Sequence, residues 1–214
     1  MYQLINNLNT RLIPRGDFME SEQIDIIFLI DRSGSMYGSE NDTIGGFNSF
    51  IAKQKAQENN TRVTTILFDH GYDVLYKRKN IYEVNDLTRN EYFVRGSTAL
   101  LDAIGRTIVT LDKEIDNKVL FVITTDGYEN SSKEFTKRQI KNMIQNHNWE
   151  FIFLGADIDS YDEAASIGIK RSHVANYRKT SKGIHDMYES VDNAVLYCKN
   201  DMKLDESWKE KLEE

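Results

Sequence analysis

The chain has 214 residues, of which 40% are hydrophobic and 29% charged, a composition that suits one globular domain and excludes a disordered chain. Its formal net charge of −7 argues against a general nucleic-acid or anionic-membrane surface. No apolar run approaches the roughly 20 residues needed to span a bilayer, so we expect neither nucleic acid nor a membrane among the partners.

Strand-like and helix-like segments alternate along the chain, which favours a parallel sheet covered by helices on both faces. The first strand is expected over 24–30, with Asp25 at its exposed start, and a helix follows from about residue 42. Segments 62–68 and 72–78 are close enough in sequence to form an antiparallel hairpin. The second strand of this hairpin is expected at a sheet edge.

The rest of the chain keeps the same alternation. It predicts an irregular piece over 82–94, a helix from about residue 98, a strand over 118–124, a helix over 132–146, a strand over 149–154, a short helix over 160–167, a weak strand over 171–176 and a long helix over 181–198. The predicted fold is therefore α/β: a three-layer, doubly wound (Rossmann-like), mostly parallel sheet with one antiparallel edge strand.

Domain boundaries are expected at the two ends of this pattern. Residues 22–199 form the predicted domain, and residues 1–21 are an extension with weak periodicity, expected to be mobile, with an added strand or partner-binding arm as the alternative. Residues 200–214 are expected to form a short helix or tail whose apolar stripe packs on its own domain.

The cysteine usage points to a reducing compartment. The single cysteine, Cys198, has no internal disulfide partner, and the start of the chain lacks the pattern of a signal peptide. We therefore expect a cytoplasmic protein. Cys198 lies on the apolar stripe of the helix over 181–198, which predicts a buried core thiol and no nucleophile.

A carboxylate and two hydroxyls follow the first expected strand. Asp31, Ser33 and Ser35 alternate along an extended stretch, so their side chains lie on one side and converge. All three offer oxygen ligands, and no soft ligand lies among them. Such a set suits a hard divalent cation such as Mg²⁺ better than Zn²⁺ or Cu²⁺.

Two later segments carry ligands of the same kind. Thr98 lies in a Gly-Ser-Thr turn that opens a helix, and Asp126 follows the strand over 118–124. With these segments the chain resembles, over residues 22–199, a von Willebrand factor A domain of intracellular type with a metal-ion-dependent adhesion site. The metal ligands that this resemblance implies are Asp31, Ser33, Ser35, Thr98 and Asp126.

The resemblance also implies a function. The metal, expected to be Mg²⁺ or else Mn²⁺ or Ca²⁺, would grip an Asp or Glu carboxylate of a protein partner. Tyr37, Tyr128 and Met36 flank the two acidic loops and are candidates for the rim of the partner surface. Glu129 and Asn130 are expected to donate or accept hydrogen bonds that support the loop. Cell adhesion is not expected, because the compartment differs from that of the extracellular family members.

The main alternative is a Mg²⁺-dependent phosphotransfer enzyme of the haloacid-dehalogenase type, which also carries an Asp after its first strand. That chemistry needs a second acid two residues later, where this chain has Ser33. The chain also lacks a Gly-rich Lys-Ser/Thr loop for nucleotide phosphates. We therefore expect no enzyme and no catalytic residues.

The same metal site would also serve a subunit that docks onto an ATPase-containing assembly. The sequence does not separate such a subunit from a free-standing binding module, so both possibilities stay open. A zinc site is not expected, because no histidine pair has i, i+4 spacing and none has a cysteine partner; the four histidines are His70, His147, His173 and His185.

Overall fold

The structure, a computed structural model, describes residues 23–57 and 60–213, so the predicted extension over 1–21 lies outside the described residues. One sheet with the strand order β3-β2-β1-β4-β5-β6 runs through the molecule. The pairing of β2 with β3 is antiparallel and the other pairings are parallel, which confirms the predicted fold class. The strands are β1 (Ile24–Asp31), β2 (Thr61–Phe68), β3 (Tyr72–Asn80), β4 (Lys118–Thr125), β5 (Glu150–Gly155) and β6 (Val174–Asn176).

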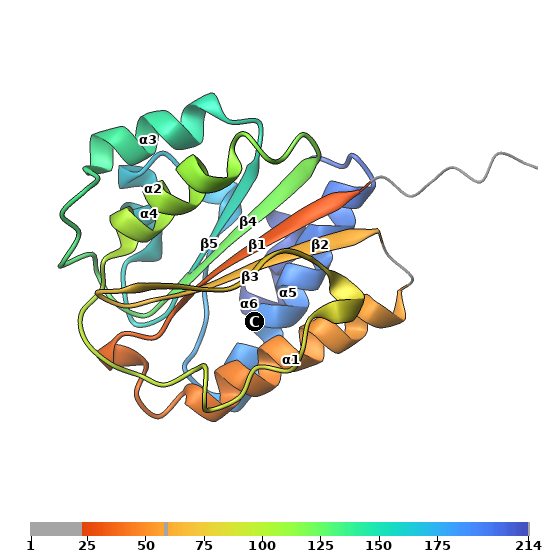
Figure 1. The fold of residues 1–214 in the computed structure, drawn as a ribbon, viewed down its shortest axis with the longest axis horizontal. Coiled ribbons are helices and arrows are strands. Elements are labelled where there is room, and N and C mark those ends of the chain that lie inside the picture. Colours follow the sequence, from red (N-terminus) through yellow and green to blue (C-terminus); the bar gives the residue numbers. More distant parts are fainter. Residues whose placement is uncertain (1–22, 58–59, 214) are drawn as a thin grey trace, which may run out of the picture.

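Helices cover both faces of this sheet (Figure 1). Helices α1 and α5 pack on one face, and α2, α3 and α4 pack on the other. The α-helices are α1 (Glu40–Ala56), α2 (Leu100–Leu111), α3 (Lys137–Asn146), α4 (Ser160–Ser166), α5 (Ser181–Lys199) and α6 (Glu210–Glu213). Short 3-10 turns lie at Gly34–Met36, Ile81–Glu83, Arg171–His173 and Glu206–Lys209.

Strand β1 divides the core into two halves because its side chains alternate between the faces. Ile26 and Phe28 belong to the cluster under α1 and α5, whereas Ile27 and Leu29 belong to the cluster under α2 and α3. All eight residues of β1 are buried. This burial on both faces is typical of the central strand of a parallel sheet.

The hairpin of β2 and β3 forms one edge of the sheet, as predicted. Its pairing is irregular near Thr64 and Thr65, and Arg78 has a positive φ of 47° there. The N–H of Arg78 donates to Thr64 Oγ1 at 3.0 Å, so this irregularity is held by a side chain. The guanidinium of Arg78 then reaches the start of β1.

The helix predicted over 132–146 begins later, at Lys137. The carboxylate of Asp102 accepts hydrogen bonds from the N–H groups of Lys133, Glu134 and Phe135. These N–H groups are held in an irregular loop, and the helix starts only after Thr136, which forms a capping box with Gln139. The early start was wrong because the competing hydrogen bonds come from another helix.

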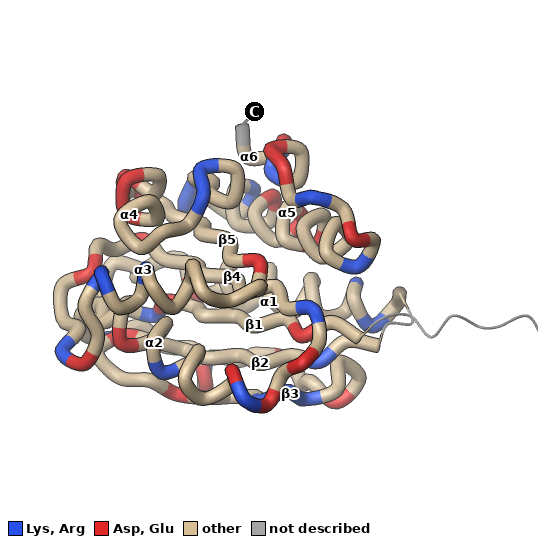
Figure 2. Tube along the Cα trace, turned by 90° about the horizontal axis from the view of Figure 1, so that it is seen from above, with Lys and Arg blue, Asp and Glu red and all other residues tan. Residues whose placement is uncertain are grey.

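The C-terminal stripe packs on the same domain. Leu204 and Trp208 are buried in the cluster under α5, and Leu212 packs against it. Trp208 Nε1 donates to the carbonyl oxygen of Ser172 at 2.8 Å. None of the helices in residues 23–57 and 60–213 has the length and apolar composition to cross a membrane. Acidic and basic residues are interspersed around the molecule (Figure 2).

The strand order reverses between β1 and β4. The chain leaves β1 toward β2 on one side, and after α2 it returns to β4 on the other side. In open α/β sheets, ligands bind beyond the carboxyl ends of the strands at the point where the order reverses. Here Asp31 and Asp126 lie at the carboxyl ends of these two strands.

Candidate functional site

Asp31 ends β1 as a buried carboxylate that is held by two short hydrogen bonds. Its Oδ1 accepts from the N–H of Ser33 at 2.6 Å, and its Oδ2 accepts from Thr125 Oγ1 at 2.5 Å. The backbone is fixed as well, because the buried hydroxyl of Tyr92 donates to the carbonyl oxygen of Asp31 at 2.7 Å. The carboxylate therefore has one defined orientation at the carboxyl end of β1.

The charge of Asp31 has no cationic partner among the described residues. In the part of the chain that the structure describes, Asp31 forms no ion pair, and both hydrogen bonds come from neutral donors. Burial raises the pKa of Asp31 to about 6 against the effect of these hydrogen bonds, and the charge of Asp126 adds to the rise. The free protein thus holds a carboxylate that is costly to ionise.

Asp69, which follows β2, is a buried carboxylate that differs from Asp31 because arginine side chains pair with it. Its Oδ2 accepts from Arg32 Nε and from Arg95 Nε, each at 2.8 Å. Burial raises the pKa of Asp69, but hydrogen bonds from Arg95, the N–H of Gly71 and Arg32 outweigh burial and hold the pKa below its ordinary value. Asp69 is a structural anion, whereas Asp31 is left for another cation.

Three hydroxyls gather beside the second carboxylate. Ser33 Oγ lies 3.1 Å from Ser35 Oγ, and Ser35 Oγ donates to Asp126 Oδ1 at 2.5 Å. A Cβ placed on Gly127 would lie 2.9 Å from Thr98 Oγ1, 3.2 Å from Ser35 Oγ and 3.7 Å from Ser33 Oγ. Gly127 therefore allows these oxygens to approach one another.

Glu129 and Asn130 form hydrogen bonds with the loop before α2, as predicted, and these bonds hold Thr98 beside Asp126. Asn130 Oδ1 accepts from the N–H of Thr98 at 3.0 Å, and the carbonyl oxygen of Thr98 accepts from the N–H of Asn130 at 3.0 Å. Glu129 Oε2 accepts from the N–H of Leu101 at 2.9 Å in the first turn of α2. The loop after β4 thus holds the loop before α2.

The structure brings all five predicted ligands to one place at the carboxyl ends of β1 and β4. The donor set consists of oxygens only, as Mg²⁺ prefers. The side-chain oxygen Asp126 Oδ2 is buried, accepts no hydrogen bond of normal geometry from any described residue, and is held only by an ion pair with Lys179. The residues present therefore fit a hard divalent cation. Among residues 23–57 and 60–213, no group of three or more His, Cys, Asp or Glu forms a further metal site.

Lys179 is a residue of this site that the sequence pattern did not single out. Its Nζ lies 2.7 Å from Asp126 Oδ2 and donates to the carbonyl oxygen of Ser35 at 2.7 Å. Lys179 lies in the loop after β6, at the same edge of the sheet as the acidic loops. That position after a strand was the available signal, but β6 is a short edge strand and its loop carries no motif.

The rim of the site differs from the expectation at one residue. The side chains of Tyr37 and Tyr128 are exposed, Tyr37 by 81%, and are available to a partner. Met36 is only 2% exposed and belongs to the interior, so its candidacy as a rim residue was wrong. The 3-10 turn over Gly34–Met36 turns the Met36 side chain inward while Tyr37 faces solvent.

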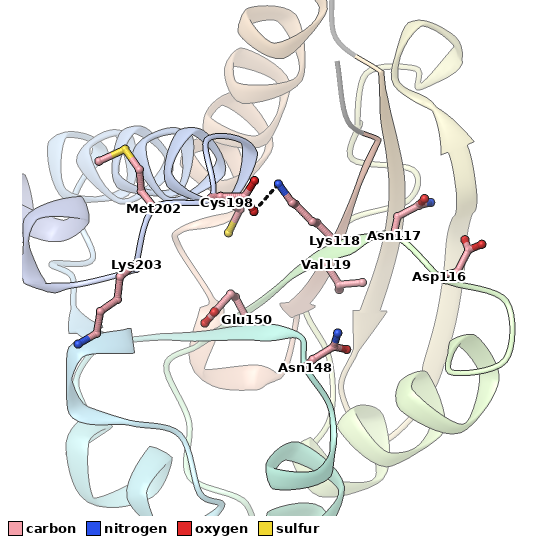
Figure 3. Close-up of a pocket in the computed structure, with 10 residues that line it drawn as sticks. Asp116, Asn117, Lys118, Val119, Asn148, Glu150, Cys198, Met202 and Lys203 are labelled. Carbon is pink, nitrogen blue, oxygen red and sulfur yellow. Dashed lines mark ion pairs between the residues drawn. The ribbon is translucent and has the colours of Figure 1, made fainter. Parts of the chain in front are cut away.

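A pocket lies at the opposite end of the sheet, at the starts of β4 and β5 (Figure 3). It has a volume of about 470 Å³ and is lined in part by Lys118, Glu150, Cys198 and Asp201. Its charges are of mixed sign, and Lys118 Nζ forms a 2.6 Å ion pair with Asp201. Burial raises the pKa of the Cys198 thiol to about 12, so this pocket offers no reactive thiolate. Convergent oxygens, and not volume, identify the site at the carboxyl ends.

Comparison with known proteins agrees with this geometry. A family model described as the von Willebrand factor type A domain matches residues 25–190. A search of the curated proteins found no match.

Solved structures share the fold at low sequence identity. Proximal thread matrix protein 1 from the mussel byssus, in a structure with a zinc-occupied MIDAS motif, is 15% identical with a TM-score of 0.62, and the match covers 83% of this chain and 46% of that chain. The VWA2 paralog of ArnB from Sulfolobus acidocaldarius is 16% identical with a TM-score of 0.58, covering 79% and 44%. The vWF domain of the pilus tip protein Mfa5 from Porphyromonas gingivalis is 9% identical with a TM-score of 0.61, covering 82% and 97%. The chain thus spans less than half the length of the mussel protein.

Proposed function

The chain belongs to the von Willebrand factor type A domain family, and from this premise we propose that it is a protein-binding module that depends on a divalent cation. Asp31, Ser33, Ser35, Thr98 and Asp126 are the proposed ligands, and Mg²⁺ is the proposed metal because every donor is a hard oxygen. The proposed partner is a protein that presents an Asp or Glu carboxylate. The cytoplasm is the proposed location, on the ground of the single cysteine.

The observation that carries this proposal is the unpaired, buried charge of Asp31. A buried carboxylate normally acquires a cation or becomes protonated. Asp31 acquires no side-chain cation among the described residues, yet it lies at the ligand-binding edge of the sheet beside Asp126. The zinc in the metal motif of the mussel protein supports the same interpretation for a divalent ion.

The proposed ligands are of two kinds, charged carboxylates and neutral hydroxyls. Asp31 and Asp126 supply the two negative charges, and the hydroxyls of Ser33, Ser35 and Thr98 supply neutral oxygens. With only two negative charges among them, these residues would leave a bound divalent cation Lewis-acidic enough to accept a carboxylate of the partner. Ser35 is exposed while Ser33 and Thr98 are buried, so the site opens to solvent on the Ser35 side. The exposed ring of Tyr37 then offers contact area beside that opening.

We also propose that the site binds without catalysis. Two residues after Asp31, the position of a general acid in phosphotransfer enzymes of the haloacid-dehalogenase type is occupied by Ser33. The hydroxyl of Ser33 faces Ser35 and its N–H holds Asp31, so no second carboxylate serves as acid or base there. Hydrolysis of a phosphate monoester in Mg²⁺ that is lost in Asp31→Asn would contradict this part of the proposal.

The proposal is tested by calorimetric titration of Mg²⁺ and Mn²⁺ into chelator-stripped protein. The wild type should bind one ion per chain, and Asp31→Asn and Asp126→Asn should weaken binding by about a hundredfold or more, because each removes a ligand charge. Asp201→Asn is the matched control: it makes the same charge change at the opposite end of the sheet, at a positive φ that Asn tolerates. It should bind metal like the wild type.

The partner is tested with the same variants. A protein retained by the wild type in Mg²⁺, and lost both in chelator and in Asp31→Asn, would support the metal-bridged contact. A partner retained by folded Asp31→Asn would exclude it. Absence of metal binding at millimolar concentrations, both to the folded wild type and to a folded variant that lacks the Lys179 ammonium group, would remove the basis of the proposal.

A further inference from the structure

A lysine side chain lies on one of the proposed metal ligands. Lys179 Nζ is 2.7 Å from Asp126 Oδ2 and donates a hydrogen bond to the carbonyl oxygen of Ser35 at the same distance. Asp157 Oδ2 lies farther off, at 3.9 Å, on an exposed side chain. The ammonium is therefore bound mainly by groups of the site itself.

The backbone around Lys179 presents this side chain in a fixed way. Tyr177 is buried, and its N–H donates to the carbonyl oxygen of Gly155 at the end of β5. Thr180 caps α5 through a hydrogen bond that its side chain accepts from the N–H of Gly183. The Lys179 side chain is only 22% exposed, whereas the nearby Lys182 is 81% exposed and pairs along its own helix with Asp186. The contact of Lys179 is thus built into the loop.

The ion pair between Lys179 and Asp126 affects the charge that the site offers to a metal. Asp31 and Asp126 together carry two negative charges, and Lys179 is the cationic side chain that pairs with Asp126 among the described residues. Asp126 Oδ2 accepts no hydrogen bond of normal geometry there, so its contact with Lys179 is an ion pair that another cation can replace. A divalent ion bound to Asp126 would repel an ammonium group at this distance.

We propose that Lys179 is a tethered cation that competes with the divalent metal for Asp126 and so sets the metal affinity of the site. This inference rests on the proposed function, because it assumes that Asp126 is a metal ligand. In the metal-free protein, Lys179 neutralises Asp126. Binding of metal requires the ammonium to leave Asp126 Oδ2, so the observed affinity is lower than the five ligands alone would provide.

The test is titration of Mg²⁺ and Mn²⁺ into chelator-stripped wild type, Lys179→Met and Lys179→Gln. We expect both variants to bind metal about tenfold more tightly or better, as for the removal of a charge repulsion in a partly buried site. Lys182→Met is the matched control, because it removes the same charge from the first turn of α5 without touching the site, and its affinity should equal that of the wild type.

Thermal unfolding supplies a second readout. In chelator, the variants at Lys179 should unfold at a lower temperature than the wild type, because Asp126 loses its counter-charge. Saturating Mg²⁺ should narrow or reverse this difference. A residue that only supported the loop would lower the unfolding temperature equally with and without metal.

The outcomes separate this inference from the function on which it rests. Equal or weaker affinity in the Lys179 variants, with normal binding by the wild type, overturns the competition and leaves the metal site standing. Binding by the variants alone supports both. Absence of binding by the wild type and by both folded variants overturns both.

Discussion

The two ends of β1 each bury an aspartate, and the protein treats these two carboxylates in opposite ways. Asp25, near the start of the strand, accepts from Arg78 Nε at 2.9 Å and from Arg78 Nη2 at 3.2 Å, and Asn117 adds a further hydrogen bond at 3.0 Å. Asp31, at the other end, accepts hydrogen bonds from Ser33 and from the hydroxyl of Thr125, and it forms no ion pair with any described residue. The fold supplies a cationic partner for the carboxylate of Asp25 but, among the described residues, none for that of Asp31.

This difference teaches that burial alone does not mark a functional carboxylate. Asp25 and Asp31 are 1% and 0% exposed, so their solvent exposure does not distinguish them. What distinguishes them is whether the chain supplies a cation. Asp69 follows the pattern of Asp25, with two arginines, although it lies at the same end of the sheet as Asp31. A buried acid without an internal counter-charge is therefore the better indicator of a cation site.

The largest expected change in stability comes from removing the charge of Asp25, the aspartate that the fold pairs with an arginine. Asp25→Asn leaves the largely buried Arg78 guanidinium without its counter-charge, and the free energy of unfolding in chelator should fall by about 3 kcal/mol. Denaturant titration measures this change. Metal affinity should stay that of the wild type, because the site lies at the other end of the strand. A loss of metal binding by the folded variant would show that the two ends are coupled.

The next prediction concerns Asp31, whose replacement by asparagine should raise the stability of the metal-free protein. The pKa of Asp31 in the folded metal-free protein, about 6, lies above its ordinary value of 3.8, so the folded state binds the proton more tightly. In chelator, the wild type should therefore lose stability as the pH rises from about 4 through about 6, and the full cost, about 3 kcal/mol, persists above that range. Asp31→Asn cannot ionise and should be the more stable protein at pH 8.

Added metal should invert this second result. At saturating Mg²⁺ the wild type should gain stability by mass action, whereas Asp31→Asn should gain little. Denaturant titrations of both proteins at pH 5 and pH 8, with and without metal, measure these differences in stability. If Asp31→Asn were less stable than the wild type at pH 8 in chelator, the ionised carboxylate would be a net stabilising group and the contrast with Asp25 would fail.

The smallest effect concerns a neutral donor. Thr125 Oγ1 donates to Asp31 Oδ2 and accepts from the N–H of Gly127, so Thr125→Val removes both hydrogen bonds. We expect a loss of about 1 kcal/mol in the free energy of unfolding and a severalfold weaker metal affinity. Thr124→Val is the matched control, because the neighbouring hydroxyl makes only a 3.5 Å contact with the carbonyl oxygen of Leu29. Equal effects of the two substitutions would show that Thr125 does not orient Asp31.

The sequence by itself determined the order of the elements and the place of the five candidate ligands. Short apolar runs and helical stripes are local patterns, and they located β1, the hairpin and α5 within one or two residues. Asp31 follows such a run directly, and Asp126 follows one after two threonines. The resemblance to the von Willebrand factor A domain predicted that the two carboxylates meet, and it agrees with the rule that parallel strands end at the same edge of a sheet.

Only the tertiary structure decided which charges are paired. Asp25 was expected at an exposed strand start, and that was wrong because Arg78, 53 residues later, reaches it from an irregular edge strand. Lys179 and Ser35 are 144 residues apart and carry no shared pattern, yet they meet at the site. Periodicity reports how a segment faces the core, whereas an ion pair depends on distances that exist only once the sheet is assembled. The cations that pair with Asp25 and Asp69, and the lack of such a cation at Asp31 among residues 23–57 and 60–213, are therefore visible only in the fold.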